Sequence, residues 1–254
     1  MGDNLDASWN AIGPRIALLT ASAQLGAARD ANAYVPAVLA EQRISVAPDG
    51  EVNPRAFSGI SSDGRALDSL LYGAVVEART AQVDSLAERL ARGSRWLDMA
   101  VHTQVADASR LAIGVGVAVR EQTGWARMVN PPCCQRCAVL AGRVYSHSQG
   151  FKRHPRCDCT MIPTHLVGDN PPGMVIGSDD VKDLTQEQRK AIADGADFNR
   201  VVNSHRAGRR SNDGMTTLEA ARRGQRRLTP EGIYKVSATR EEAVQRLRAN
   251  GYLL

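Results

Sequence analysis

Aromatic residues are scarce in this sequence, since Phe, Trp and Tyr make up only 4% of its 254 residues. The chain is 43% hydrophobic, so a core must be built chiefly from Ala, Leu and Val, in one sizeable domain or two small ones. Long apolar runs are also missing. The longest, Leu111 to Val119, contains two glycines and is shorter than the roughly 18 residues of a membrane span. We therefore expect a soluble, intracellular protein with no membrane partner.

Two further signals are absent. The segment Met1–Asn4 does not begin a secretory signal, which argues against an oxidised, disulfide-bonded scaffold. The pair Gly114-x-Gly116 is not followed by Gly-Lys-Ser/Thr, so it lacks the pattern of a phosphate-binding loop. We expect these glycines to allow close helix packing instead.

All five cysteines lie between residues 133 and 159. The pattern is Cys134-x2-Cys137, then sixteen residues, then His154-x2-Cys157-x-Cys159. A structural zinc site needs four ligands in a tetrahedron, and one tight turn can present two ligands that are separated by two residues. The spacing therefore predicts a structural zinc site. It leaves open which of the five residues is omitted, His154 or Cys159.

The cysteines have three further interpretations, namely a spare ligand, disulfide bonds and a catalytic thiol. Cys133 is a spare that can replace Cys134 only through a longer spacing to Cys137. Disulfides are disfavoured by the odd number of clustered cysteines. A catalytic thiol would be Cys157 with His154 as its base, which requires a lowered thiol pKa.

The residues between the ligand pairs predict a hairpin. Residues 140–145 form a turn, containing Gly142, that leads into a short strand, and Gly150–Phe151 form a second turn back toward His154. We expect a hairpin-like insert that is clamped at its base by the metal ligands.

Helical periodicity dominates the first half of the chain. Residues 5–42 are Ala-rich and predict two short helices or one broken helix, with Pro14 near a helix start and Pro36 interrupting a helix. Residues 44–62 predict a connection whose Phe57 packs against the helices that follow.

The strongest helical pattern comes next. Asp63 caps a first helix, Gly93–Ser94 ends it, and a second helix continues to about Gln122. We expect the two to pack as an antiparallel pair. Beyond the cysteine module, Thr185 with Gln188 forms a capping box for a short helix.

The predicted fold is mainly α with a small α+β zinc-knuckle-like module. Its segments are residues 1–62, an N-terminal helical segment and connection; 63–130, the long antiparallel helical pair; 131–163, the Cys/His metal-binding module; 164–184, an extended linker; and 185–254, a basic C-terminal region with short helices.

The net charge of +5 is concentrated in one stretch. Between residues 206 and 227, seven arginines accompany Asp213 and Glu219, so 7 − 2 = +5 and the rest of the chain is formally neutral. We predict that this stretch contacts nucleic-acid phosphates or an acidic protein surface, and a solvated loop is the alternative. The seven are Arg206, Arg209, Arg210, Arg222, Arg223, Arg226 and Arg227.

These motifs carry a family resemblance. Long helices followed by Cys-x2-Cys-x2-Leu-x-Gly at 134–142 and His-Pro-x-Cys-x-Cys at 154–159 resemble the phage Mu F-like minor head (head morphogenesis) proteins. Over most of residues 65–254 the chain resembles minor capsid proteins of tailed phages that infect actinobacteria. The cysteine module is the most specific part of this resemblance.

The resemblance implies a virion component, located in the capsid interior or at the portal vertex and made in the host cytoplasm. It implies association with the portal protein and with the major capsid or scaffolding protein. The expected role is in head assembly and in genome packaging or release, with the basic stretch touching packaged double-stranded DNA, rather than in catalysis.

Two enzyme classes are the alternatives. Some relatives are labelled capsid maturation proteases, but Ser146 and His147 are adjacent and cannot face each other as nucleophile and base on a strand. A zinc-supported nuclease would need His165, His205 or Asn203 beside the clamp, and no His-His or Asp-His pair marks it.

Overall fold

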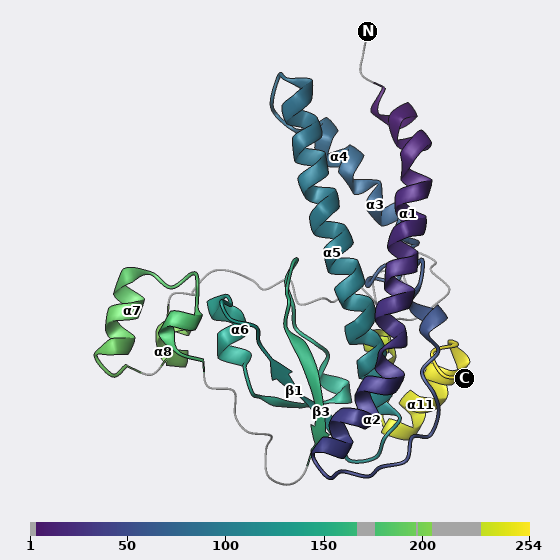
Figure 1. Cartoon of the computed structure of the whole chain (residues 1–254), viewed down its shortest axis with the longest axis vertical. Helices are drawn as coiled ribbons and strands as arrows, with labels where there is room; N and C mark the ends of the chain where they lie inside the picture. The colour runs from purple at the N-terminus through teal and green to yellow at the C-terminus, as the bar shows by residue number, and fades with distance from the viewer. Residues whose placement is uncertain (1–3, 167–175, 197, 205–229) are drawn as a thin grey trace.

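The computed structural model describes residues 4–166, 176–196, 198–204 and 230–254. Its architecture is mainly helical, with one three-stranded antiparallel sheet (Figure 1). This confirms the predicted fold class. Within the described residues, no helix is both long and apolar enough to span a bilayer.

Two helices open the chain, as predicted. Helix α1 spans Leu5–Arg29 and helix α2 spans Ala31–Glu41. The prolines were placed wrongly, because Pro14 lies inside the long α1 and Pro36 lies inside α2 without interrupting it. Packing of both helices against α5 (Leu86–Ala118) offsets the backbone hydrogen bond that each proline removes.

The connection after α2 is anchored at one short helix. The 3₁₀ helix η1 (Pro54–Phe57) places Phe57 in the core, where its ring lies 5.4 Å from that of Tyr252. The prediction that Phe57 packs inward is confirmed. Its partner comes from the far end of the chain, so this contact joins the N-terminal and C-terminal segments.

The helical pair forms, but its break lies elsewhere than predicted. Helices α3 (Leu67–Leu71) and α4 (Gly73–Thr80) are followed by the 33-residue α5, so the turn falls at residues 81–85. The predicted break at Gly93–Ser94 was wrong. A Cβ atom at Gly93 would lie 2.7 Å from the carbonyl oxygen of Ala74. This glycine therefore permits close contact between α4 and α5.

The upper part of the molecule is a helical arm. Figure 1 shows the N-terminal halves of α1 and α5, together with α3 and α4, projecting beyond the rest of the protein. The C-terminal half of α5 differs, since residues 112–118 are all buried. The arm thus continues directly into the main core.

The sheet was only partly predicted. It has the order β2-β1-β3, with β1 (Thr123–Met128) central between β2 (Val144–Ser146) and β3 (Thr160–His165). Because β1 lies before the cysteines, the module is not a self-contained hairpin. The predicted second helix ends at about Gln122, and no strand was predicted at residues 123–128. Five of the six residues of β1 are buried, which hides the alternation that marks a strand.

The remaining helices are short. Thr185 caps α7 (Gln186–Ala193) in the predicted capping box with Gln188, through bonds of 3.2 and 2.9 Å. Helix α8 spans Phe198–Ser204. At the C-terminus, α10 (Pro230–Val236) and α11 (Arg240–Ala249) pack against each other and against α5.

The predicted linker is not extended over its described part. Residues 178–180 form the 3₁₀ helix η3, and Val181 is fully buried. The backbone of Cys133 bonds both the carbonyl oxygen of Asp180, at 2.8 Å, and the amide of Lys182, at 2.9 Å. This short bridge fastens the segment to the cysteine module.

Candidate metal centre

The first ligand pair lies at the start of helix α6 (Gln135–Leu140). Cys134 is the N-cap residue of this helix, and its sulfur accepts a hydrogen bond from the amide of Cys137 at 3.4 Å. This bond satisfies one of the free amides of the first helical turn. It also brings the two sulfurs to the same side of the turn.

The second group lies in the tight turn before β3. The amide of Cys157 donates to the carbonyl oxygen of His154 at 3.0 Å, which closes the turn. Arg156 adopts a φ of +59°, in the left-handed region. Cys159 immediately precedes β3, so the sheet fixes the position of its sulfur.

These two halves bring all five predicted ligands together. The Nε2 atom of His154 lies 3.3 Å from Cys134 Sγ and 3.5 Å from Cys137 Sγ, and Cys137 Sγ lies 3.9 Å from Cys157 Sγ. Around a tetrahedral zinc ion, neighbouring ligand atoms are about 3.5–3.8 Å apart, given the usual metal–ligand distances. The sulfur and nitrogen atoms are therefore close enough to bind a metal ion.

The ligands form two overlapping triads. One is Cys134, Cys137 and His154, and the other is Cys137, Cys157 and Cys159; within each, the ligand atoms lie within 4.8 Å of one another. Cys137 belongs to both. Cys133, predicted as a spare, belongs to neither triad.

Protons shared between neighbouring side chains shift the pKa values of the cluster. The hydrogen bond from Cys137, assisted by that from His154, outweighs burial and lowers the pKa of the Cys134 thiol to about 4. Contacts with Cys137 and Cys159 likewise lower the pKa of Cys157. The bond to Cys134 raises the pKa of Cys137 and also raises that of His154 to about 9. A bound cation would take the place of these shared protons.

His154 is oriented by its own turn. Its Nδ1 atom lies 2.8 Å from the carbonyl oxygen of Pro155, a contact that places the ring proton on Nδ1. Nε2 is then the atom that faces the sulfurs. If a bound cation replaced the proton that Nε2 shares with Cys134, this nitrogen would present its lone pair to the cluster, as a metal ligand must.

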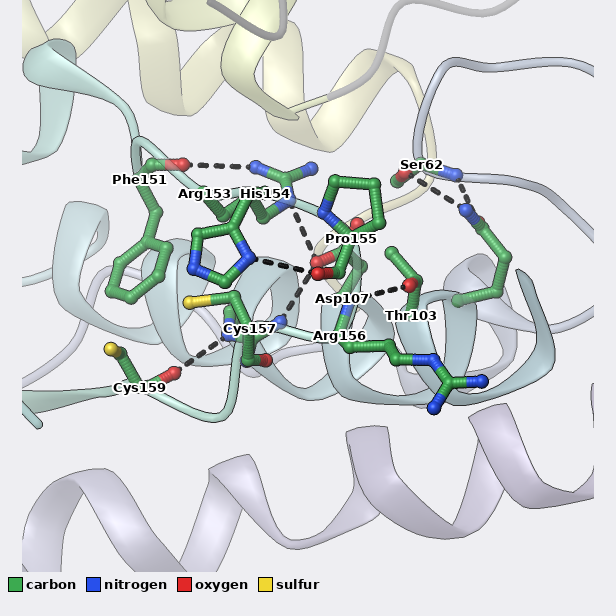
Figure 2. Close-up of polar contacts among 12 residues, drawn as sticks. Ser62, Thr103, Asp107, Phe151, Arg153, His154, Pro155, Arg156, Cys157 and Cys159 are labelled. Carbon is green, nitrogen blue, oxygen red and sulfur yellow. Dashed lines mark hydrogen bonds and ion pairs between the residues drawn. The ribbon is translucent and has the colours of Figure 1, made fainter. Parts of the chain in front are cut away.

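A buried ion network supports the second ligand group from α5 (Figure 2). Arg110 donates from Nε to the carbonyl oxygen of Cys159 at 2.8 Å and from Nη2 to that of Cys157. Its Nη1 lies 2.9 Å from Asp107, which also accepts from Arg153 Nε at 2.7 Å. The long helix therefore holds directly the backbone that carries Cys157 and Cys159.

A second buried arginine supports the first ligand group. Arg127, on β1, is 1% exposed, and its Nη1 lies 3.9 Å from Cys137 Sγ. Its guanidinium also lies 4.0 Å from the ring centroid of Phe151, which packs on Trp125. Cation–π contact and burial thus place a positive charge beside the shared ligand Cys137.

Sequence reasoning did not identify Asp107, Arg110 or Arg127. A signal for the first two was present, because an acid and a base three residues apart sit in the half of α5 that is otherwise apolar. Nothing local marks Arg127, since its partners come from residues 137–152. The seven arginines of the predicted nucleic-acid contact, residues 206–227, lie outside the described residues.

Comparison with known proteins gave one family. A family model described as VG15 protein matches residues 66–190, just under half of the chain. The matched segment contains α5, the sheet and all five candidate ligands. Comparison with curated proteins and with solved structures gave no match. Over residues 66–190 the chain is therefore similar to the VG15 protein family, which suggests a viral (phage) protein.

Proposed function

We propose that this protein is a phage minor capsid protein of the head morphogenesis type. It associates with the portal and the inner procapsid and assists head assembly, genome packaging or release. The observation that carries the proposal is the Cys/His cluster fastened to a long helix. The same residues carry the resemblance to Mu F-like minor head proteins, and they lie within the match to the VG15 family.

Zinc is the metal that we propose for the cluster. Four sulfurs and one imidazole nitrogen are soft or borderline donors, which zinc prefers to the oxygen donors of calcium or magnesium sites. Cys134, Cys137, Cys157 and either His154 or Cys159 would hold the ion. Protein ligands then fill all four positions, whereas a catalytic zinc keeps one position open for water.

A closed site supports a structural role. The ion would stabilise a segment that is rich in turns, because metal binding contributes folding free energy directly. Arg110 and Arg127 would transmit that rigidity to α5 and β1. The result is a fixed surface at the base of the helical arm, which we propose as the platform for the portal or inner capsid.

The enzyme alternatives find less support. His165 ends β3, six residues after Cys159, which at strand spacing is about 20 Å from the cluster. It is therefore poorly placed for a zinc-supported nuclease. For a protease, Ser146 ends β2 while the ring of His147 packs against Tyr234, with centroids 5.6 Å apart. The hydroxyl of Ser146 instead lies near the hydroxyl of Ser148 and the side-chain amide oxygen of Gln149.

We propose that the basic stretch, residues 206–227, contacts packaged DNA or an acidic rim of the portal. If DNA is the partner, affinity for a duplex should fall steeply as salt rises, because phosphate contacts release counterions. Full-length protein should be titrated with duplex DNA at several salt concentrations. Affinity that is absent or independent of salt would favour the acidic protein surface.

Particle composition tests the main proposal. Proheads and mature virions of the phage that encodes this protein should contain it in small copy number by quantitative mass spectrometry. Deleting its gene should reduce filled heads, and wild-type protein should restore them better than the Cys134→Ser/Cys157→Ser variant. Normal heads without the protein, or its absence from particles, would reject the proposal.

A further inference from the structure

We infer that a pocket between the C-terminal ends of α2 and α5 binds a small organic carboxylate with an apolar body. The two ends lie at the opposite end of the molecule from the helical arm (Figure 1). The pocket has a volume of about 400 Å³, within the range of small-molecule sites. Its walls combine apolar groups from Leu39, Ile44 and Val46 with two arginines, Arg43 and Arg120.

Arg120 is a buried cation with unused hydrogen-bonding capacity. It is only 9% exposed, and its Nη1 donates to the carbonyl oxygen of Gly116 at 2.5 Å. Its Nε has no hydrogen-bond partner within the described part of the chain. Burial lowers the pKa of its guanidinium. A buried charge in this state is costly unless a counter-charge is supplied.

The nearby acids are already engaged elsewhere. Asp49, whose amide bonds the carbonyl oxygen of Val119, forms an ion pair with Arg240. Glu121, the next residue after Arg120, also faces Arg240, at 4.0 Å. Among the described residues, no carboxylate pairs with Arg120. An external anion would complete its coordination.

Helix capping explains only part of the position of Arg120. The bond to Gly116 satisfies a carbonyl group in the last turn of α5, and a cation there also favours the helix dipole. That bond uses Nη1. Nε is itself buried, so an anion in the pocket would reach the guanidinium at Nη2, by a charge-assisted hydrogen bond.

A second cation lies at the mouth of the pocket. Arg43 is exposed and follows α2 with a φ of +58°, a conformation in which helices usually end with glycine. Its side chain lines the same pocket as Arg120. With Ile44 and Val46 on the walls, the pocket favours a ligand that carries one carboxylate next to a branched apolar group.

The test uses full-length protein labelled with ¹⁵N-arginine and two matched probes, N-acetyl-L-leucine and its uncharged amide. The Nε–H signal of Arg120 is assigned by its loss in Arg120→Gln. We expect N-acetyl-L-leucine to shift this signal saturably, with a dissociation constant on the order of 1 mM for a ligand of this size. The amide should not shift it.

Two variants change the pocket while leaving the buried Arg120 in place. Arg43→Gln should weaken binding about fivefold, since it removes one partly solvated charge. Ala40→Trp, a change at an exposed position, should fill the pocket and abolish binding while the Arg120 signal persists. No shift at about 20 mM probe, an equal shift with the amide, or unchanged binding in Ala40→Trp would overturn the inference.

One further probe distinguishes the source of the carboxylate. A four-residue peptide ending in leucine would bind at least tenfold more tightly than N-acetyl-L-leucine if the natural ligand is a polypeptide C-terminus. Equal or weaker binding identifies a free small acid. Both results support a carboxylate site.

Discussion

Asp107 and Arg110, one turn apart on α5, form an ion pair of 2.9 Å whose side chains are only 2% and 5% exposed. Arg110 also donates to the carbonyl oxygens of Cys157 and Cys159. The pair therefore joins the long helix to the segment that carries Cys157 and Cys159. Its charges are satisfied inside the protein, which is the condition under which buried ions are tolerated.

Replacing Arg110 with Met should destabilise the protein by about 3 kcal/mol, because two buried carbonyl groups lose their donor and Asp107 keeps only Arg153. The free energy of unfolding is measured in denaturant with zinc present. Arg156→Met is the matched control, since Arg156 also contacts α5, through Asp98, but with both side chains more than half exposed. The control should lose at most about 1 kcal/mol. Equal losses would show that the buried network has no special role.

Removing the proposed zinc ion should loosen more than the cysteine segment. Because β1 pairs with both β2 and β3, chelation should speed hydrogen exchange at Ala126 and Arg127 as well as across residues 133–165. The helical arm, which packs by its own contacts, should stay protected. Hydrogen exchange with mass spectrometry, before and after chelator, gives both readouts. Unchanged exchange in β1 would show that the stability of the sheet does not depend on the metal.

The Cys134→Ser/Cys157→Ser variant provides the matched comparison. Elemental analysis of protein purified without chelator should find one zinc per chain in the wild type and none in the variant, because each substitution removes a thiolate ligand. Cys133→Ser is the control, since Cys133 lies outside both triads. If that control lost the metal but kept its fold, Cys133 would be a metal ligand and the proposed ligand set would be wrong.

The Cys/His cluster could be predicted from the sequence because its geometry is local. Cys134 and Cys137 are presented by one helical turn, and His154 and Cys157 by one tight turn. The capping box at Thr185 was predictable for the same reason. Such contacts span three residues, and residue identity alone determines them.

The sheet and the helix break depend on partners far away in sequence. Strand β1 contains Gly124, and a Cβ atom there would lie 2.4 Å from the carbonyl oxygen of Tyr145. Gly93 is read locally as a helix end, but in the fold it makes room for Ala74. In both cases glycine marks a close approach of two segments rather than a turn. No local pattern distinguishes these two uses.

Gly93→Ala should therefore destabilise the arm. Its Cβ would lie 2.7 Å from a backbone oxygen that cannot move without shifting α4, so we expect a loss of about 2 kcal/mol despite the better helix propensity of alanine. Gly26→Ala in α1 is the control, because nothing lies within 4 Å of its added Cβ. That change should stabilise the protein by up to about 1 kcal/mol. Thermal unfolding measures both, and a neutral or stabilising Gly93→Ala would show that α4 does not contact α5 closely.

Acid should weaken the contact between His147 and the C-terminal helices. Burial, together with the charge of Arg240, lowers the pKa of His147, and Glu241 opposes this only in part. A histidine with a lowered pKa in the folded state is neutral there while it is already protonated in the unfolded chain. Stability is therefore lost as pH falls from the unfolded pKa, about 6.5, toward the lower folded value.

His147→Phe keeps a ring against Tyr234 and cannot titrate. The unfolding free energies of the two proteins, measured with zinc at pH 7.5 and pH 5, should diverge in favour of the variant at pH 5. A constant difference at the two pH values would mean that His147 ionises equally well in the folded and unfolded chains.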